Sequence, residues 1–589
     1  SGHFLVSALN ELIAIKSELG ILADKTGKVL PVSVKVANDE LLVEENNETI
    51  FEYAAPAGKT GKTENQRVQE TLFHEKEKLI EHCLFGVDIN GNSVKICRLR
   101  LWIELLKNAY YTEESGYTQL ETLPNIDINI KRGNSLISRF ALDSDLSTVF
   151  KQQKFSYDTY RLAVESYKTA PSKQAKEGLL KLINEIKEQF KTTFYNNDPL
   201  VKQLSNLRGQ LALLEQDMDL FGKRIRDEKE VEIQKKRLKQ SIANHEEKIQ
   251  DIKNSKIYRN AFEWRFEFPE VMDKNGNFVG FDVVIGNPPY GVKLHSEFKD
   301  YFSKYYKSFQ GNHEVYFYFI ELAEKILSSK AFTAYISPDT WINIPQGKKI
   351  RELVLDSFSV QQIVKLPTKV FEDVSINAII TFLKHNTSNE LCDVIIFESN
   401  DSLEKILSNN ITRRQVNVNN WIKTEDKQFM ILQHDTIFSI VEKIGSKGIK
   451  AERFLDVSQG IIPYSKENQD EKTVKERLFH SNKKLSKEYG PWIQGRAITR
   501  YNINLENCEY LKYGNWLHRS RNRKYFQGER ILVQEITGGN PPRISATFHD
   551  DILYHDPGII SCINTSTILD IKYILSYCHG IMLNALQKE

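Results

Sequence analysis

The sequence predicts an α/β fold with a mainly parallel sheet, because short apolar runs alternate with amphipathic helical stretches. Residues 84–88 and 281–285 are apolar runs that end in a carboxylate or lead into a glycine, as buried strands do. Residues 4–19 place their apolar side chains on one face of a helix, and Gly20 follows as a stop. The alternation predicts further strands at 126–130, 332–336, 360–366 and 376–383, and further helices ending at Tyr111 and spanning 315–327 and 348–358. Residues 21–70 are polar, and we expect a long surface excursion there.

A helical insertion is expected at about residues 150–258, where two segments carry apolar residues in steps of three and four. That rhythm is typical of a coiled-coil seam. The first seam is Leu200, Leu204, Leu207, Leu211, Leu214, Met218 and Phe221, and the second is Leu238, Ile242, His245, Ile249 and Ile252. We expect a hairpin packed seam against seam. It is either a solvated arm or an arm that contacts DNA or a partner.

The domain boundary is expected near residue 390, where short strands, many turns and frequent aromatic and basic residues begin. We therefore expect one domain over residues 1–389 and a second, mixed α+β domain over residues 390–589. A chain of 589 residues can bury two cores of this size.

The composition is that of a globular protein, with 40% hydrophobic and 27% charged residues. The formal net charge is only +2, so any affinity for nucleic acid must come from local clusters of charge. The six cysteines form no Cys-x-x-Cys pair, and we expect neither a metal site nor a disulfide framework. We find no membrane-spanning run and no signal peptide, and expect a cytoplasmic protein with reduced thiols.

The loop Asn287-Pro288-Pro289-Tyr290 is the most informative stretch, because it directly follows an apolar strand. Ligands of open α/β sheets bind outside the carboxyl ends of the strands. The two prolines lack N–H groups and stiffen the backbone, while Pro288 holds Asn287 extended. An ordinary proline-rich turn is the alternative reading.

These groups suit an NH2 substrate on a flat ring. The Asn287 side-chain oxygen and the Pro288 carbonyl can each accept one N–H. Accepting both hydrogens draws the nitrogen lone pair out of conjugation and makes it a better nucleophile. Tyr290 can stack on the ring, which contributes about 1–3 kcal/mol for a base. A base of a duplex must first be flipped out of its stack.

Several stretches, taken in order, resemble the gamma-class N6-adenine DNA methyltransferases of the TaqI type, especially those in type IIG restriction-modification enzymes. They are residues 1–5, Asp88 in Phe-Gly-Val-Asp-Ile-Asn, Gly133-Asn134-Ser135-Leu136, Phe262-Glu263-Trp264 with Phe268-Pro269-Glu270, the Asn-Pro-Pro-Tyr loop, and Val370-Phe371 before Ile376-Asn377-Ala378. The resemblance covers most of residues 1–385. It implies a Rossmann-like class I methyltransferase sheet and S-adenosyl-L-methionine as cofactor.

The resemblance also implies roles for single residues. Ser1, Gly2, Asp88, Ile89, Asn134 and Ser135 are the expected cofactor-binding residues, and Tyr290 and Phe371 are expected to stack on the flipped base. A carboxylate after the second strand can accept both hydroxyls of a ribose, although Asp88 could instead cap a helix. Two departures are clear. The glycine-rich half of the first cofactor motif is absent, and Asn134 stands where such enzymes often carry Asp.

The second domain carries a basic and aromatic stretch at residues 512–530. Such a mixture suits phosphate contacts and base stacking, or else a solvated surface. The expected DNA-binding residues are Arg496, Arg519, Arg521, Arg523 and Lys524. By resemblance, residues 491–498 and 530–535 look like parts of a target-recognition domain that binds double-stranded DNA.

Two other functions remain open from the sequence. The Asn-Pro-Pro-Tyr loop also activates amines in RNA and protein-glutamine methyltransferases, and the chain could be a DNA-specificity fragment without activity. No Pro-Asp…Glu-x-Lys nuclease array is present. We expect the natural protein to continue before Ser1, where a nuclease domain would reside. The oligomeric state and the DNA sequence that is read are not predicted.

Overall fold

The chain forms two compact units, Ser1–Phe429 and Met430–Glu589. The computed structural model describes residues 2–579 except 46–48, 55–62, 123–128, 141, 143–154, 171, 198, 216–227, 255, 312–313, 369, 372–375, 408–409, 433–438, 441–442, 446, 467, 507 and 537–543. The unit boundary lies later than the expected position after residue 389. Residues 391–417 still contribute two strands to the sheet of the first unit, which is why the boundary moves.

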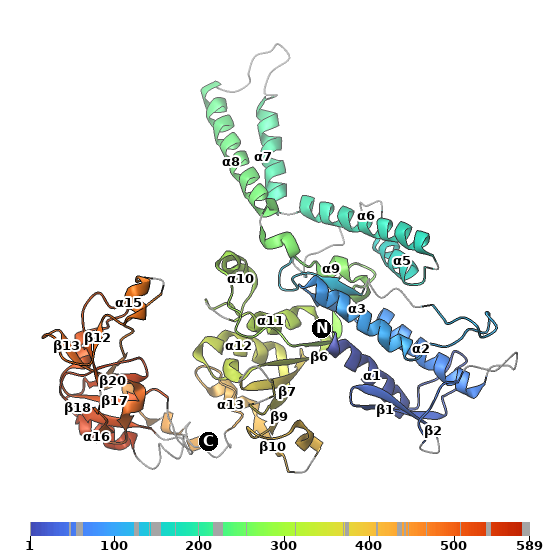
Figure 1. The fold of residues 1–589 in the computed structure, drawn as a ribbon. Helices are drawn as coiled ribbons and strands as arrows, with labels where there is room; N and C mark the ends of the chain where they lie inside the picture. Colours follow the sequence, from blue (N-terminus) through green and yellow to red (C-terminus); the bar gives the residue numbers. More distant parts are fainter. Residues whose placement is uncertain are drawn as a thin grey trace. The chain divides into compact units, whose positions relative to one another are not determined.

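A six-stranded sheet forms the centre of the first unit, in the order β10-β9-β7-β8-β6-β5 (Figure 1). Its strands are β5 (Phe281–Gly286), β6 (Leu327–Pro338), β7 (Phe358–Lys365), β8 (Ala378–His385), β9 (Leu391–Ile396) and β10 (Thr412–Asn417). The pairs β5–β6 and β7–β9 are parallel, whereas β8 is antiparallel to both β6 and β7 and β10 is antiparallel to β9. The sheet is therefore mixed and not mainly parallel, although β5, β6, β7 and β9 all point the same way. The connection from β7 to β8 contains Pro367 and no helical pattern, so it supplies no crossover helix for a parallel pairing.

One face of this sheet is covered by helices and the other exposes apolar side chains. The helices α11 (Tyr316–Ile326) and α12 (Lys348–Ser357) pack on the covered face. On the opposite face, Val283, Phe332 and Phe382 are 60%, 46% and 37% exposed. Val283 of β5 pairs with Phe332 of β6. Phe382 of β8 pairs with Ala334, which lies two residues after Phe332 and faces the same side of the sheet. The exposed side chains therefore form one continuous surface.

A smaller two-stranded parallel sheet lies earlier in the chain. It pairs β3 (Gly86–Asp88) with β4 (Ile130–Arg132). Around it pack α1 (His3–Glu18), α2 (Glu64–His82) and α3 (Gly91–Leu106) through one buried core that includes Leu9, Leu72 and Leu101. The expected strand at 126–130 begins later than predicted, and its residues 126–128 lie outside the described chain.

The expected surface excursion at residues 21–70 contains a β-hairpin that the sequence analysis did not predict. The strands β1 (Val32–Ala37) and β2 (Glu40–Glu45) pair antiparallel around Asn38 and Asp39. These two residues have φ of 52° and 65°, the left-handed conformation of the turn that best fits a tight hairpin. The signal was present as Asn-Asp between two alternating runs.

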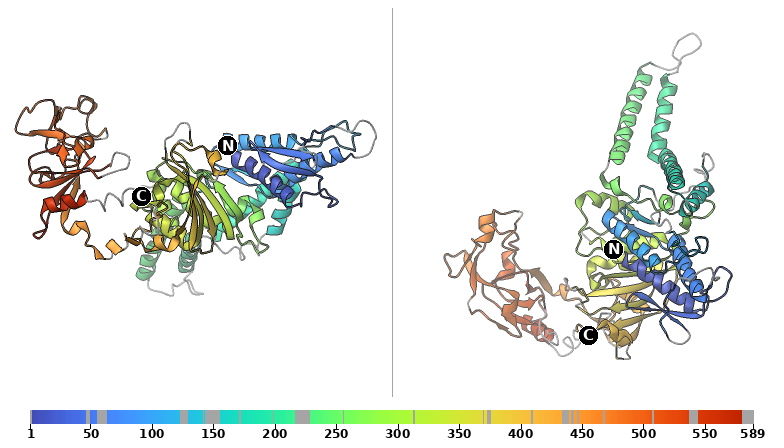
Figure 2. Two further views of the ribbon diagram at one scale, coloured as in Figure 1. Left: turned by 90° about the horizontal axis from the view of Figure 1, so that it is seen from below. Right: turned by 45° about the vertical axis from the view of Figure 1, so that its right-hand side comes forward.

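The insertion consists of α5 (Tyr157–Lys168), α6 (Lys173–Asn197), α7 (Pro199–Glu215) and α8 (Glu228–Asn254). Figures 1 and 2 show α7 and α8 side by side as a hairpin. Leu204, Ile242 and Ile249 are buried between them, with Leu200, Leu207 and Leu211 at the margin. The seam positions Met218 and Phe221 lie outside the described residues. Short helices α9 (Trp264–Glu267) and α10 (Lys299–Tyr305) flank β5, and α13 (Val418–Lys423) follows β10.

The second unit is built mainly of short strands. One sheet has the order β11-β20-β17-β18 and a second has the order β12-β16-β13-β19. The bounds are β11 (Leu455–Gln459), β12 (His480–Ser481), β13 (Tyr489–Ile493), β14 (Ile498–Thr499), β15 (Asn502–Ile503), β16 (Glu509–Lys512), β17 (Arg530–Gln534), β18 (Ala546–His549), β19 (Tyr554–His555) and β20 (Ile559–Asn564), with helices α15 (Glu471–Lys475) and α16 (Ile571–Cys578). The strand β14 pairs with β15, and α16 packs against β17 and β18.

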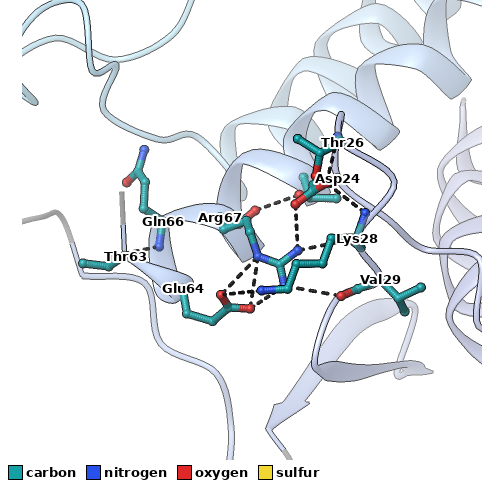
Figure 3. A network of polar contacts seen from close by, with 9 residues as sticks. Asp24, Thr26, Lys28, Val29, Thr63, Glu64, Gln66 and Arg67 are labelled. Atoms are coloured by element: carbon teal, nitrogen blue, oxygen red, sulfur yellow. Dashed lines mark hydrogen bonds and ion pairs between the residues drawn. The ribbon is translucent and has the colours of Figure 1, made fainter. Parts of the chain in front are cut away.

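Arg67 joins the start of α2 to the turn before β1 (Figure 3). Its guanidinium donates to Asp24 Oδ2 at 2.8 Å, to the backbone carbonyls of Lys28 and Val29, and to the Glu64 carboxylate. Hydrogen bonds from Thr26 and Arg67 hold the pKa of Asp24 well below its ordinary value, and Arg67 lowers the pKa of Glu64. Both shifts favour the folded state above about pH 4, and the contribution disappears as acid protonates the carboxylates.

Replacing Arg67 with Met should lower the thermal midpoint of the first unit by about 2 °C or more, because several acceptors lose their donor together. The change is measured by calorimetry at pH 7. Lys28→Met is the matched control, since Lys28 is largely exposed and reaches Glu64 only at 3.8 Å. Equal midpoints for the two variants would contradict a structural role for Arg67.

His555 is fully buried in the second unit and is held neutral. Its Nε2 lies 2.8 Å from Ser561 Oγ, and its Nδ1 lies 3.0 Å from the Asp556 carbonyl oxygen. Burial lowers the pKa of His555 to about 4, and burial likewise lowers the pKa of His480 to about 4. An unfolded chain binds these protons near pH 6.5, whereas the folded unit does not. Acid between pH 6.5 and 4 therefore favours unfolding, by up to about 1.4 kcal/mol per pH unit for each histidine.

Hydrogen-exchange protection factors of residues 554–564 should be lower at pH 5 than at pH 7, by up to about 20-fold per histidine. His555→Gln should reduce this pH dependence, whereas His518→Gln should leave it unchanged because His518 does not occupy the buried strand core. Equal protection of the wild-type chain at the two pH values would show that these histidines are not held neutral.

Candidate active site

The carboxyl ends of four parallel strands meet at one edge of the central sheet. The strand β5 ends at Gly286 and leads into the Asn-Pro-Pro-Tyr loop, and its neighbour β6 ends at Pro338. The strands β7 and β9, which run in the same direction, end at Lys365 and Ile396. This edge is where α/β sheets place their ligands.

The Asn-Pro-Pro-Tyr loop presents two open acceptors. Asn287 is exposed and Pro288 is buried. The proline is therefore held by its surroundings, while the Asn287 side-chain amide is accessible to a substrate. Within the described part of the chain, no group donates a hydrogen bond to Asn287 Oδ1 or to the Pro288 carbonyl oxygen. After the loop, the backbone N–H of Gly291 donates to Glu314 Oε2 at 3.1 Å, which anchors the other end.

Tyr290 and Phe371 lie together at this edge. Their ring centroids are 6.2 Å apart and the planes are inclined by 66°. The Tyr290 hydroxyl donates to the Ile336 carbonyl oxygen at 3.1 Å, which ties the loop after β5 to the end of β6. Burial raises the pKa of Tyr290 to about 12, so the ring stays neutral at ordinary pH. Phe371 packs against Val364 and Leu366, and the structure thus brings two predicted stacking residues into contact.

A second group of predicted residues meets at the ends of β3 and β4. Asp88 is the last residue of β3 and lies beside Arg132, and its carbonyl oxygen accepts the backbone N–H of Gly133 at 3.0 Å. Asp88 Oδ1 accepts the backbone N–H of Asn90 at 2.7 Å. Asn90, and not Asp88, caps α3, so the helix-cap reading of Asp88 was wrong. Ile89 is 55% exposed beside this carboxylate.

The chain around Asn134 is tightly constrained. A Cβ on Gly133 would come within 2.6 Å of the Phe262 ring, so only glycine fits there. Asn134 Oδ1 accepts the backbone N–H of Leu136 at 3.2 Å, and the Ser135 carbonyl oxygen accepts the Trp264 indole N–H at 3.1 Å. One Asn134 acceptor is therefore partly engaged in the turn itself.

Gly2 lies next to these strands, whereas Ser1 is outside the described residues. Gly2 has φ of 81°, and a Cβ there would come within 2.9 Å of Cys97 on α3. Leu5 packs close to Gly86 of β3. The start of α1 is thus held against the same strand that ends in Asp88.

The sequence interpretation missed a basic cavity beside Asp88. It has a volume of about 480 Å³ and is lined by Asn90, Gly91, Asn92, Val94, Lys95, Arg98 and Arg132. Arg98 and Arg132 come from α3 and from the end of β4, and both donate to backbone carbonyl oxygens. No spacing in the sequence shows that these cations converge, because pairing of β3 with β4 brings them together.

An aromatic cluster connects the two groups of candidate residues. Phe85, which directly precedes β3, lies 5.8 Å from Phe281, the first residue of β5. Phe268 contacts both rings at 5.1 and 5.9 Å. Val87 and Val284, further along the two strands, pack against the same core, so β3 and β5 both border it.

The predicted DNA-binding residues of the second unit differ in availability. Arg519 and Arg523 are exposed, and Arg523 lies 6.0 Å from the Tyr513 ring centroid. Arg496 is exposed too, whereas Arg521 is half-buried and has φ of 59°, with its carbonyl oxygen accepting the Tyr513 hydroxyl. Lys524 is ion-paired with Asp456, which partly neutralises its charge. Arg530, in the same basic stretch, is fully buried and donates to the carbonyl oxygens of Gly528 and Asp551, so it is structural.

Two kinds of feature are absent from the described residues. No helix among them is long and apolar enough to span a membrane. In the same part of the chain, no three His, Cys, Asp or Glu side chains gather as metal ligands.

Comparison with known proteins gives a family for part of the chain. Residues 82–371 match the Eco57I restriction-modification methylase family. The chain is 22% identical over 570 residues to a Methanocaldococcus jannaschii protein, RM.MjaORFECS2P, described as a candidate type II restriction enzyme and methyltransferase. That alignment covers 93% of this chain and 42% of the relative, so the chain spans less than half of the relative's length. A 116-residue stretch is 30% identical to the Escherichia coli type II restriction enzyme and methyltransferase RM.Eco57I, covering 18% of this chain and 12% of that protein.

Solved structures of restriction-modification enzymes resemble this chain only distantly. The type IIL restriction-modification enzyme MmeI in complex with DNA is 11% identical with a TM-score of 0.35, over 76% of this chain and 64% of that chain. The type IIG restriction endonuclease BpuSI is 13% identical with a TM-score of 0.25, over 53% of this chain and 46% of that chain.

Proposed function

We propose that this chain, whose residues 82–371 fall in the Eco57I restriction-modification methylase family, transfers a methyl group from S-adenosylmethionine to adenine N6 in duplex DNA. It would act as the methyltransferase and DNA-recognition part of a restriction-modification enzyme. The observation that carries the proposal is the rigid turn at the end of β5, where Asn287 Oδ1 and the Pro288 carbonyl oxygen accept no hydrogen bond from any described residue.

The two acceptors suit a single NH2 group. Asn287 Oδ1 and the Pro288 carbonyl oxygen each accept one N–H. Because Pro288 and Pro289 have no backbone N–H, neither of them can donate a hydrogen bond to these two oxygens. Holding both hydrogens localises the lone pair on nitrogen, where it can attack an electrophilic methyl group. Because Pro288 is buried and Gly291 is anchored by Glu314, the acceptors are already in position before the substrate arrives.

Tyr290 and Phe371 suit the ring that carries the amine. Their rings contact each other at an inclination of 66°, and a planar base can meet an aromatic ring either face to face or edge to face. An adenine removed from a duplex loses its stacking with neighbouring bases, and contact with these rings restores part of that energy, about 1–3 kcal/mol per base.

Asp88 and Ile89 suit the nucleoside half of the cofactor. Among the described residues, only the Asn90 N–H donates to the Asp88 carboxylate, at Oδ1, which leaves Oδ2 to accept ribose hydroxyls. The exposed Ile89 side chain next to it can pack on a purine. When bound, S-adenosylmethionine supplies the electrophilic methyl group. The aromatic cluster around Phe85 and Phe281 holds this half-site alongside β5.

The second unit suits contacts with the DNA backbone and bases. Its exposed arginines stand on a stretch whose Trp516 is 42% exposed, and Lys512 lies 4.8 Å from that indole. Basic side chains next to an exposed aromatic ring are typical of nucleic-acid surfaces. A nuclease in the same natural polypeptide remains a proposal drawn from the names of the two relatives.

Asn287→Ala should reduce the rate of methyl transfer to adenine by about 100- to 1,000-fold, the usual effect of removing one polar group that stabilises a transition state. DNA affinity should be unchanged. The assay uses tritiated S-adenosylmethionine with DNA, structured RNA and a glutamine-containing peptide as separate substrates. Asn275→Ala, in an exposed turn before β5, is the matched control. Full turnover by Asn287→Ala, or transfer only to RNA or peptide, would overturn the proposal.

Arg519→Ala and Arg523→Ala should each weaken DNA binding and reduce the salt dependence of the binding constant by about one unit of log–log slope. Lys524→Ala should have a smaller effect, because Asp456 already pairs with Lys524. Fluorescence anisotropy at several salt concentrations measures the slope. An equal effect of all three substitutions would contradict the assignment of the exposed arginines.

A further inference from the structure

Two neighbouring parallel strands end in polar loops at the same edge. The strand β5 leads into Asn287, and β6 leads through Pro338 into Asp339. Gly286 lies level with Tyr335, so β6 continues beyond the end of β5, through Pro338, before it reaches Asp339. The Tyr290 hydroxyl donates to the Ile336 carbonyl oxygen at 3.1 Å, which places the loop directly against this part of β6.

The backbone around Asp339 is held on both sides. The Asp339 N–H donates to the Asn377 carbonyl oxygen at 2.9 Å, just before β8. Trp341 is fully buried, and its indole N–H donates to Ser337 Oγ at 3.1 Å. The buried Arg351 guanidinium donates to the Trp341 and Ile344 carbonyl oxygens. A Cβ on Gly347 would come within 2.3 Å of the Trp341 carbonyl oxygen, so the segment after Asp339 is closely packed.

The Asp339 carboxylate is partly buried and has no counter-ion in direct contact. Among the described residues, no side chain forms a hydrogen bond or an ion pair with it. Two titratable groups on neighbouring elements interact electrostatically with this carboxylate. Lys365, at the end of β7, lowers the pKa of Asp339, and Asp339 in turn raises the pKa of Tyr316 on α11. Burial is the larger influence and raises the pKa of Asp339 above its ordinary value. A half-buried carboxylate without a partner is costly to keep and is typical of functional sites.

The proposed reaction releases a proton that the two acceptors cannot take. Methylation forms an N–C bond while the S–C bond breaks, and its electron pair neutralises the sulfonium sulfur. The nitrogen then carries a positive charge until one N–H proton leaves. The Asn287 amide and the Pro288 carbonyl are neutral oxygens that accept hydrogen bonds but are very weak bases. A carboxylate can accept the proton and become a neutral carboxyl group.

We propose that Asp339 is the proton acceptor of the reaction, taking from the methylated amine, directly or through one water, the proton that it must lose. This inference rests on the proposed function. It deepens that function by giving a second polar group at the same edge a different task. Asp339 takes up the released proton, whereas Asn287 and Pro288 accept hydrogen bonds from the amine. The closely packed segment 337–347 fixes the backbone that carries this carboxylate before the base arrives.

The test measures the single-turnover rate of methyl transfer to DNA between pH 5 and 9, for the chain with Asp339→Asn. This substitution preserves shape and removes the basic group. The rate at pH 8 should fall by about 100-fold, the acid limb of the pH profile should disappear, and the Kd for DNA and for cofactor should be unchanged. Asp356→Asn, on the exposed side of α12, is the matched control and should retain the wild-type profile.

The pH–rate profile of Lys365→Met is a second test, in which the Asp339 carboxylate itself is kept. Lys365 lowers the pKa of Asp339, so its removal should move the acid limb of the profile to higher pH without lowering the rate on the plateau. A wild-type rate and profile in Asp339→Asn, or an unmoved acid limb in Lys365→Met, would overturn the role of Asp339. A wild-type chain that transfers no methyl to adenine would instead overturn the proposed function.

Discussion

The aromatic cluster of Phe85, Trp264, Phe268 and Phe281 joins two sheets that have no hydrogen bond in common within the described chain. One side holds β3, which ends in Asp88, and the other holds β5, which ends in Asn287. Phe85 and Phe281 lie at the starts of their strands, and their contact places both strands on one core. Hydrogen bonds from the Trp264 indole N–H and the Tyr306 hydroxyl to the Ser135 and Leu136 carbonyl oxygens add to this link.

In the proposed reaction, consecutive strand ends at one edge of the central sheet take different chemical tasks. The loop after β5 supplies neutral acceptors, the segment after β6 supplies a carboxylate, and the region after β7 supplies Phe371. Each of these segments is anchored by a hydrogen bond to a neighbour or by burial of its own side chains. Such anchoring matters because a transition state is stabilised only by groups that need not rearrange to meet it.

Much of the fold could be predicted from periodicity. The strands β5, β7 and β8 and the helices α1, α11 and α12 lie within a few residues of their predicted bounds, since their apolar spacing is strong. The direction of β8 could not be predicted, because the pattern of a buried strand is the same in both orientations. The hairpin β1–β2 was missed although Asn38-Asp39 was a usable turn signal. The unit boundary was placed too early because β10 is rich in Thr, Arg, Gln and Asn and resembles an exposed segment.

The candidate site was only partly accessible from sequence. Asn287, Tyr290 and Phe371 stand in motifs, and the contact of Tyr290 with Phe371 agrees with a common role, which remains a proposal. Asp339 and the cavity with Arg132 stand in no motif, and only strand pairing shows their position. In the basic stretch of the second unit, composition could not separate exposed Arg519 and Arg523 from buried Arg530, because only Arg530 belongs to a strand of the buried core, β17.

The identity of the methylated nucleoside tests the central claim most directly. Duplex DNA containing many sequences would be incubated with the chain and S-adenosylmethionine carrying a deuterated methyl group, then digested to nucleosides and analysed by mass spectrometry. Two acceptors on a stiff turn that holds an exocyclic amine predict label on adenine N6 alone. Label on a ring carbon, label on another base, or DNA that stays unlabelled would contradict the account.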